Sequence, residues 1–202
     1  MVEKNPFSGL PSGTTKVAER QYFLSEGDSK KVLDACPTIE WRLIFALARW
    51  GGLHCPSEVL TLRWGDVLWN QDRFIVHSAK TVHHEGHATR LMPLFPELGP
   101  ILREAFDSAE KGAEYVVCKT RDSNANFRTT MSKIIKRAGL KPWPKLFQDL
   151  RATRATELAD QFPTHVATAW LGHSERVAQK SYWQVTDEHF QQAVEQSAAN
   201  AL

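Results

Sequence analysis

Apolar residues recur at helical spacing in three stretches of the first third of the chain. The first stretch follows Ser25 and Asp28, which stand at the spacing of a helix-capping pair, and it stops at Pro37. The second, residues 40–50, is apolar on almost every side and ends at a glycine pair, which predicts a largely buried helix. A third, short helix is expected over about residues 56–62, because a proline is well suited to a first turn.

The spacing changes after residue 65 and becomes helical again after residue 96. Residues 66–69, 73–77 and 89–93 are short runs bounded by turn residues, and they predict three strands of a small antiparallel sheet. Further helices are expected over residues 98–109, 126–138, 146–161, 164–170, 176–183 and 187–199. The predicted fold class is therefore α+β: mainly helical, with a three-stranded antiparallel sheet.

The composition is that of one soluble domain with a sizeable core, since 42% of the 202 residues are hydrophobic and 24% are charged. Residues 1–20 are rich in Pro, Gly, Ser and Thr and are expected to form a linker or a frayed arm, which leaves residues 21–202 for the domain. No apolar run approaches the roughly 20 residues of a membrane span, and no secretory signal is recognisable. Three cysteines without C-x-x-C spacing favour reduced thiols over disulfides or a zinc site. We therefore expect an intracellular protein.

Positive charge is concentrated in one part of the chain, although the net charge is only +2. Residues 119–145 contain eight Lys or Arg against the single acid Asp122, whereas the segment after residue 182 contains acids and no Lys or Arg. One face could therefore meet phosphates, the alternative being an ordinary solvated helix face. The candidate phosphate-contacting residues are Lys119, Arg121, Arg128, Lys133, Lys136 and Arg137.

Four segments carry the candidate chemistry. Two of them lie in the second half, where the sequence QDLR at 148–151 precedes LGH at 171–173, and Tyr182 follows nine residues after the histidine. The other two are GGLHCPSEVLTLRWGDV at 51–67 and the run from Lys80 to Leu94. Together, in this order, they resemble the catalytic domain of the tyrosine recombinase, or phage integrase, family. Its pattern has T-G-L-R-x-x-E in a first box, a lysine on a β-hairpin, then H-x-x-R, L-G-H and a tyrosine.

The resemblance, which spans about residues 23–190, implies the catalytic-domain fold of DNA breaking-rejoining enzymes and site-specific DNA recombination or integration. Tyr182 would be the nucleophile that forms a 3′-phosphotyrosyl bond, which stores the energy of the broken linkage, so that no cofactor is expected. Arg151 and His173 would donate hydrogen bonds to the scissile phosphate, and Lys80 would protonate the leaving 5′-oxygen. Gln148 stands where the family has the first histidine of H-x-x-R, and it can still donate a hydrogen bond.

A second departure affects the expected activity more. His54 stands at the position of the family's first catalytic arginine, and one additional residue separates it from Glu58. With an unperturbed pKa of about 6.5, a histidine is mostly neutral at pH 7 and cannot make a bidentate charged contact. We therefore expect reduced activity, unless Arg49 or Arg63 supplies the missing charge. Glu58 is expected to be a buried acid that braces the site.

The expected partners are double-stranded DNA and further copies of the chain, assembled as a tetramer on DNA, in a cytoplasmic, nucleoid-associated location. Only about 20 residues precede the catalytic domain, so the family's N-terminal core-binding domain is expected to be absent. Either the chain is a fragment of a longer protein or it binds DNA weakly alone.

Two other functions compete with this interpretation. A recombinase-like protein weakened at His54 would bind DNA without cutting it. A zinc enzyme is suggested by HHEGH at 83–87, although the spacing fails H-E-x-x-H and no metal site is expected. Individual residues also have structural alternatives: Tyr182 could be a core aromatic side chain, Arg151 could pair with Asp149, and Lys80 could be a surface lysine.

Overall fold

The first helices of the computed structural model, which describes residues 22–78, 89–121, 126–186 and 189–191, form where the pattern predicts them. Helix α1 (Glu26–Asp34) begins after Ser25, whose hydroxyl accepts the N–H of Asp28 at 3.2 Å. Helix α2 (Ile39–Arg49) is buried along the whole of its second half, and α3 (Ser57–Thr61) is short. The local capping and periodicity signals therefore locate this part of the fold correctly.

The three predicted strands form one antiparallel sheet in the order β1-β2-β3. Strand β1 (Val67–Leu68) pairs with β2 (Arg73–His77), and β2 pairs with β3 (Thr89–Pro93). Phe74 lies opposite both Val67 and Met92, and these three side chains are buried. One face of the sheet thus packs onto the core, as the twofold alternation of a strand requires.

The helices of the second half also follow the prediction, with small shifts at their ends. They are α4 (Gly99–Asp107), α5 (Phe127–Arg137), α6 (Leu146–Gln161), α7 (Thr164–Leu171) and α8 (Glu175–Ser181). Helix α8 begins one residue earlier than predicted, because Ser174 caps it by accepting the N–H of Val177, and it ends just before Tyr182. Most of the helix predicted over residues 187–199 lies outside the described residues.

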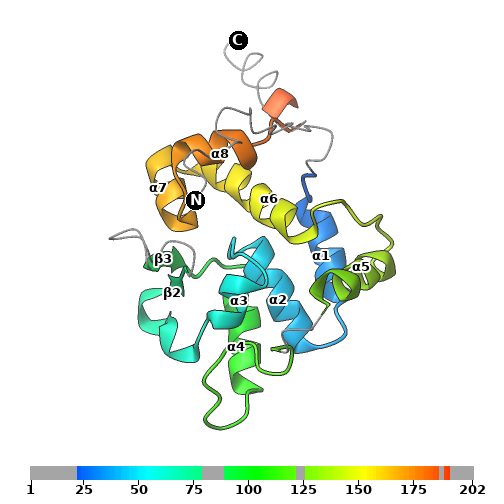
Figure 1. Ribbon diagram of the computed structural model, residues 1–202, viewed down its shortest axis with the longest axis vertical. Coiled ribbons are helices and arrows are strands. Elements are labelled where there is room, and N and C mark those ends of the chain that lie inside the picture. Colours follow the sequence, from blue (N-terminus) through cyan, green and yellow to red (C-terminus); the bar gives the residue numbers. More distant parts are fainter. Residues whose placement is uncertain (1–21, 79–88, 122–125, 187–188, 192–202) are drawn as a thin grey trace, which may run out of the picture.

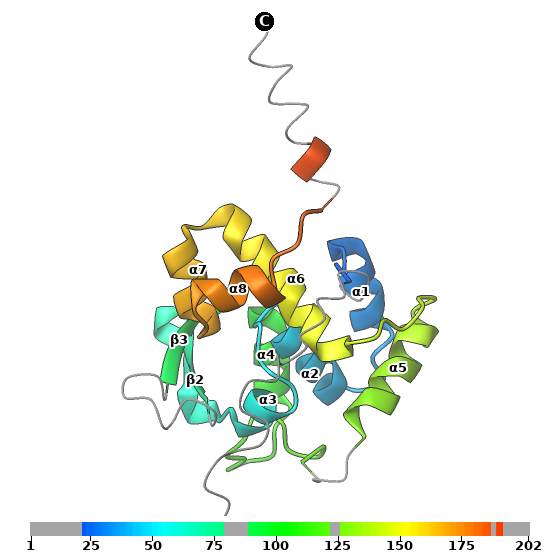
Figure 2. The same cartoon turned by 45° about the horizontal axis from the view of Figure 1, so that its top comes forward.

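Helix α6 crosses the molecule between two groups of elements (Figures 1 and 2). A large apolar core joins helices α1 to α5, the sheet and the first part of α6. A smaller core joins the rest of α6 to α7 and Tyr182. Helix α7 also packs against β3, so the strands meet the C-terminal helices. This arrangement brings the described parts of the four segments with candidate chemistry, which are distant in sequence, to one region around α6; of the segment 80–94, these are residues 89–94.

Two sequence expectations concern features outside the site. Within the described residues, no helix combines the length and the apolar character that a membrane span requires. The three cysteines carry free thiols, as expected, and burial raises the pKa of Cys36 and of Cys55 to about 12. Thiols that hold their protons so firmly are poor nucleophiles, which fits a structural role for both residues.

Candidate active site

The middle of α6 is buried but strongly polar. Apolar and polar side chains alternate there. The buried polar ones are Asp149, Arg151, Thr153, Arg154 and Thr156. Burying a polar group costs free energy unless the group finds a hydrogen-bond partner. The polar side chains of such a helix therefore either bind one another and their neighbours, or line a binding site. The partners of each residue show which description applies.

Arg151 is 2% exposed and donates hydrogen bonds to the backbone carbonyl groups of Gly52 and Leu171. Among the described residues, the other buried arginines all reach a glutamate: Arg49 and Arg154 pair with Glu157, and Arg90 pairs with Glu58. Arg151 has no such ion pair, and its Nε has no hydrogen-bond partner.

The expected alternative, a pair between Arg151 and Asp149, is therefore wrong. Burial, followed by the nearby charge of Arg90, lowers the pKa of Arg151. A buried cation without a counter-ion is costly, and an anion bound from outside would relieve that cost. Arg151 thus has the surroundings of an anion-binding residue.

Tyr182 and His173 stand beside this guanidinium. The two rings stack with centroids 4.9 Å apart and planes 15° apart, and the Arg151 guanidinium carbon lies 5.5 Å from the Tyr182 ring centroid. Both ring nitrogens of His173 are buried without a hydrogen-bond partner in the described structure. The three residues that two separate motifs name therefore meet in one place, where the Nε of Arg151 and the ring nitrogens of His173 have no hydrogen-bond partner among the described residues.

Thr156 holds the backbone that carries Tyr182, a role that the sequence pattern did not indicate. Its hydroxyl accepts the N–H of Gln184 at 3.1 Å, and its single proton is shared between the carbonyl oxygens of Ala152 at 3.1 Å and Tyr182 at 3.3 Å. Thr156 lies on α6 five residues after Arg151. One rigid helix thus positions both the guanidinium and the phenol, which a precise reaction geometry requires.

Glu58 is buried, as expected, and its partner is Arg90 of strand β3. Two hydrogen bonds of 2.8 and 2.7 Å join the guanidinium to the two carboxylate oxygens, and the backbone N–H of His54 adds a third at 2.9 Å. Burial alone would raise the pKa of Glu58, but the hydrogen bonds and charge of Arg90 and the His54 N–H outweigh it and lower that pKa. Glu58 is therefore a stable anion that fixes Arg90.

The remaining candidates occupy different surroundings. His54 is half-buried at the start of α3, where its carbonyl oxygen accepts the N–H of Glu58. Gln148 is exposed on the first turn of α6. Lys80 lies outside the described residues, as does the segment 83–87 that suggested zinc.

Neither arginine proposed as a replacement for the first catalytic arginine fits that role. Arg49 is fully buried and donates to Glu157, Ser29 and the Leu24 carbonyl oxygen. Arg63 is half-exposed and pairs with Glu114. The guanidinium of Arg49 is thus engaged by internal partners and that of Arg63 by a surface carboxylate, and neither has an observed contact with Arg151, His173 or Tyr182.

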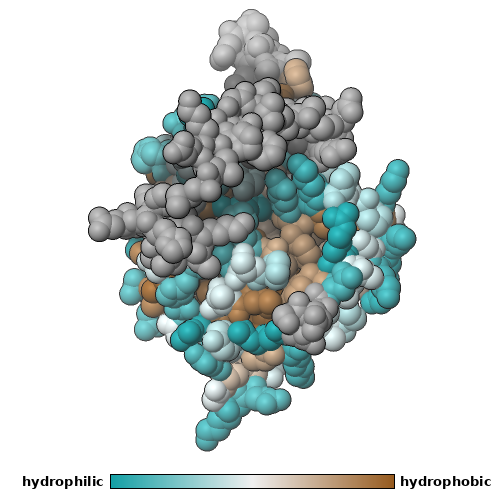
Figure 3. Space-filling view, in the orientation of Figure 1, coloured by the Kyte–Doolittle hydropathy of each residue, from teal (hydrophilic) through white to brown (hydrophobic). Residues whose placement is uncertain are grey.

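The six candidate phosphate-contacting residues, listed above from Lys119 to Arg137, are all exposed. Four of them lie on α5, whose edge of the molecule is covered by hydrophilic side chains (Figure 3). Arg121 is held over the Tyr115 ring at 3.5 Å and binds the Leu60 carbonyl oxygen. In both ribbon views, α5 lies on the opposite side of the molecule from α7 and β3 (Figures 1 and 2).

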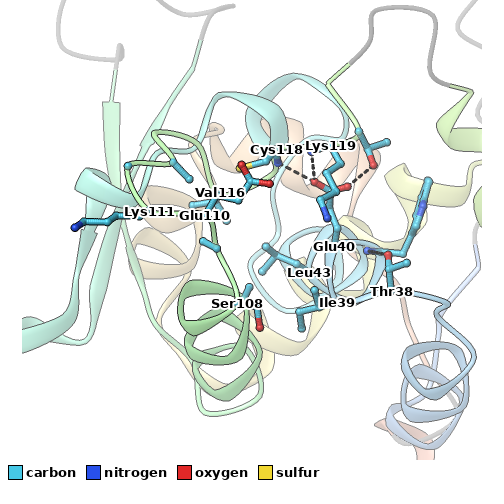
Figure 4. Close-up of a pocket in the computed structure, with 16 residues that line it drawn as sticks. Thr38, Ile39, Glu40, Leu43, Ser108, Glu110, Lys111, Val116, Cys118 and Lys119 are labelled. Atoms are coloured by element: carbon cyan, nitrogen blue, oxygen red, sulfur yellow. Dashed lines mark hydrogen bonds between the residues drawn. The ribbon is translucent and has the colours of Figure 1, made fainter.

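A cavity of about 710 Å³ lies between the start of α2, the end of α4 and residues 108–120 (Figure 4). At its edge, the Glu40 carboxylate accepts the backbone N–H groups of Cys118 and Lys119 and the hydroxyl of Thr120. None of the catalytic candidates lines this cavity. The hydrogen bonds of Glu40 anchor the segment that carries Lys119 and Arg121.

The buried His173 makes the stability of the fold depend on pH. Burial, and then the charge of Arg151, lowers the pKa of His173 to about 4. Between that value and the unfolded pKa of about 6.5, the unfolded chain takes up a proton that the folded chain refuses, so acidification destabilises the fold. We expect His173→Gln to lose less stability than the wild type between pH 7 and pH 5, measured by urea unfolding.

The comparison between variants is needed because burial also raises the pKa of Asp149 to about 6, which has the opposite effect on stability. Asp149 is present in both proteins, so its contribution cancels in the difference. His165→Gln, at an exposed position of α7, is the matched control and should behave as the wild type. Equal pH dependence in the wild type and His173→Gln would contradict the assignment.

Comparison with known proteins agrees with this geometry. The sequence profile described as "Phage integrase family" matches residues 22–189. Curated protein sequences gave no match. Among solved structures, XerA recombinase has a TM-score of 0.72 at 19% identity, over 87% of this chain and 65% of that one.

Two further structures contain DNA. A lambda integrase(75-356) dimer bound to a COC' core site has a TM-score of 0.68 at 20% identity, over 92% of this chain and 69% of that one. The Tn1549 transposon integrase in complex with transposon right end DNA has a TM-score of 0.67 at 16% identity, over 96% and 72%. At these identities the likeness shows the fold: a mainly helical domain with a three-stranded antiparallel sheet.

Proposed function

The chain belongs to the phage integrase family, and from that premise we propose that it is a tyrosine recombinase that cuts and rejoins DNA through Tyr182. The phenolic oxygen attacks phosphorus, the bond from phosphorus to the 5′-oxygen breaks, and a 3′-phosphotyrosyl bond remains. The phenol proton passes to water, and the departing 5′-oxygen gains a proton from the Lys80 ammonium group. In the reverse step, the 5′-hydroxyl of another strand attacks the same phosphorus and releases Tyr182.

The observation that carries this proposal is the buried Arg151, which has no carboxylate partner and lies beside Tyr182 and His173. A phosphodiester is an anion that gains further charge in the five-coordinate transition state, so fixed donors without internal acceptors stabilise it. Arginine suits this role because its planar fork donates two hydrogen bonds and keeps its charge. His173, neutral at pH 7, adds one N–H donor.

The direct test is covalent attachment to DNA. The protein is incubated with a pool of duplexes that have a randomised central segment and a nick, which traps the cleaved strand. Adducts that survive SDS are captured and sequenced. A phosphotyrosyl link to Tyr182, mapped by mass spectrometry, is expected. DNA bound in a gel-shift assay but never attached would favour the second candidate, a recombinase-like protein that binds DNA without cutting it.

The chain spans 65% of the length of the XerA recombinase chain, so the assembly is also a proposal. A similar protein, lambda integrase, is found as a dimer on a core site and as a tetramer on a Holliday junction. We propose that this chain likewise binds duplex DNA and forms a tetramer on it. The six exposed basic residues would contact backbone phosphates, because such contacts position a protein on DNA.

A separate prediction concerns His54, the neutral residue at the first-arginine position. His54→Arg is expected to raise the rate of covalent attachment about tenfold or more, because one preorganised donor is typically worth about 10²- to 10³-fold in rate. His54→Ala should change the rate little at pH 8, where an imidazole carries almost no charge. Single-turnover attachment to the selected duplex measures both. A rate that neither substitution changes would show that residue 54 does not face the phosphate.

A further inference from the structure

Arg90 lies inside the site, although no motif assigns it a role in the reaction. Its side chain is 9% exposed and makes three hydrogen bonds: two to Glu58 and one, from Nε at 2.8 Å, to the carbonyl oxygen of Trp170. These bonds tie strand β3 to α3 and to the end of α7. The guanidinium is therefore fixed in place.

Arg90 and Arg151 join the same two segments of the chain. Arg151 binds the carbonyl groups of Gly52 and Leu171, and Arg90 binds Glu58 and the carbonyl group of Trp170. Arg90 also lies against Gly172, where an added Cβ would come within 2.8 Å of its Cδ. The two guanidinium groups thus stand side by side. The carbonyl groups that they bind on α7 belong to successive residues, Trp170 and Leu171, and only Gly172 separates these from His173.

The number of donors and the charges leave room for a phosphate. Arginine has five N–H donors, and the three hydrogen bonds of Arg90 leave two N–H groups without an acceptor in the part of the chain that the structure describes. Three charged groups influence one another here: the two positive guanidinium groups of Arg90 and Arg151 and the one negative carboxylate of Glu58. One bound phosphodiester, with its single negative charge, would bring this buried group to neutrality, which is the condition that a low-dielectric site favours.

We propose that Arg90 is the second cation that contacts the scissile phosphate, opposite Arg151. This inference rests on the proposed function. The Oε2 atom of Glu58 accepts both the backbone N–H of His54 and an N–H of Arg90, so Arg90 is bound to the same carboxylate as the residue that stands at the first-arginine position. Arg90 therefore supplies from a strand the charge that the His54 loop lacks.

The test compares two substrates. Arg90→Gln combined with Glu58→Gln removes both members of the pair, so that no buried carboxylate is left unpaired. On the selected duplex, this variant should attach about 10²-fold more slowly than the wild type. On the same duplex with a methylphosphonate at the scissile position, which removes one negative charge, the loss should shrink to less than about tenfold, because the missing cation has less charge to stabilise.

The outcome that overturns the inference is an equal loss on both substrates, which is what a purely structural role produces, or no loss on either. Arg90→Lys keeps the positive charge opposite Glu58 and should recover part of the rate, which guards against failure of the double variant to fold. Arg63→Gln removes a charge from an exposed arginine and is the matched control.

A second readout separates this inference from the proposed function. If the wild type forms no adduct, the proposed function fails, and binding of inorganic phosphate decides the role of Arg90. Phosphate, compared with chloride at equal ionic strength, should raise the melting temperature of the wild type and of Arg63→Gln more than that of the double variant. An equal rise in all three proteins, or no rise in any, overturns the inference.

Discussion

A Tyr182→Phe variant is expected to form no SDS-stable adduct with DNA. The substitution removes the hydroxyl group whose oxygen is the proposed nucleophile. It keeps the ring that stacks on His173. The free energy of unfolding should therefore change by no more than about 1 kcal/mol, the net value of a typical hydrogen bond. Gel electrophoresis in SDS measures the adduct, and urea unfolding measures the stability.

Tyr115→Phe is the matched control, since the sequence contains only three tyrosines and Tyr115 packs against Arg63 and Arg121, outside the site. It should form adducts at the wild-type rate. Attachment that persists in Tyr182→Phe and disappears in Tyr115→Phe would identify Tyr115, outside the site, as the nucleophile and contradict the assignment of Tyr182. Attachment that persists in both would show that neither Tyr182 nor Tyr115 is the nucleophile.

Arg151→Lys should slow single-turnover attachment by about 10²- to 10³-fold, the cost of losing one preorganised donor of the transition state. Lysine keeps the charge but cannot reproduce the planar fork, so it cannot hold the carbonyl groups of Gly52 and Leu171 and still reach a phosphate. DNA binding in a gel-shift assay should weaken far less than attachment, because the interaction is strongest in the transition state.

Arg154→Lys controls for the cost of altering a buried arginine on the same helix. Arg154 is 4% exposed and pairs with Glu157, and its guanidinium stacks on the Phe95 ring at 4.0 Å. Both variants should therefore lose stability in urea unfolding, but only Arg151→Lys should lose the rate of attachment. If both rates fell equally at equal stability, Arg151 would be a structural residue like its neighbour.

Most elements of the fold could be predicted from the sequence, because the signals that determine them are local. Ser25, which caps α1, and Ser174, which caps α8, act within three residues of themselves. The three strands were found because turn residues bound each of them. Prediction was less accurate at the C-terminal ends of α4 and α8, which each end two residues before the predicted position, because helix ends are set by local capping and fraying more than by the apolar repeat.

The choice of Tyr182, Arg151 and His173 as candidates also came from the sequence, through the resemblance of QDLR, LGH and the following tyrosine to the family's pattern. Their mutual contacts support that choice without testing the chemistry. Lys80 lies outside the described residues, so its role as the proton donor stays a prediction.

The charge balance of the site was decided by the tertiary structure alone. Arg90 meets Glu58 across 32 residues and Trp170 across 80, and Arg151 meets Gly52 across 99. In the sequence, Arg49 and Arg63 looked better placed than Arg90 to replace the arginine missing at residue 54. Helices and strands arise from neighbours along the chain, whereas the pairing of a buried charge depends on which segments the folded core brings together, and no local pattern records that.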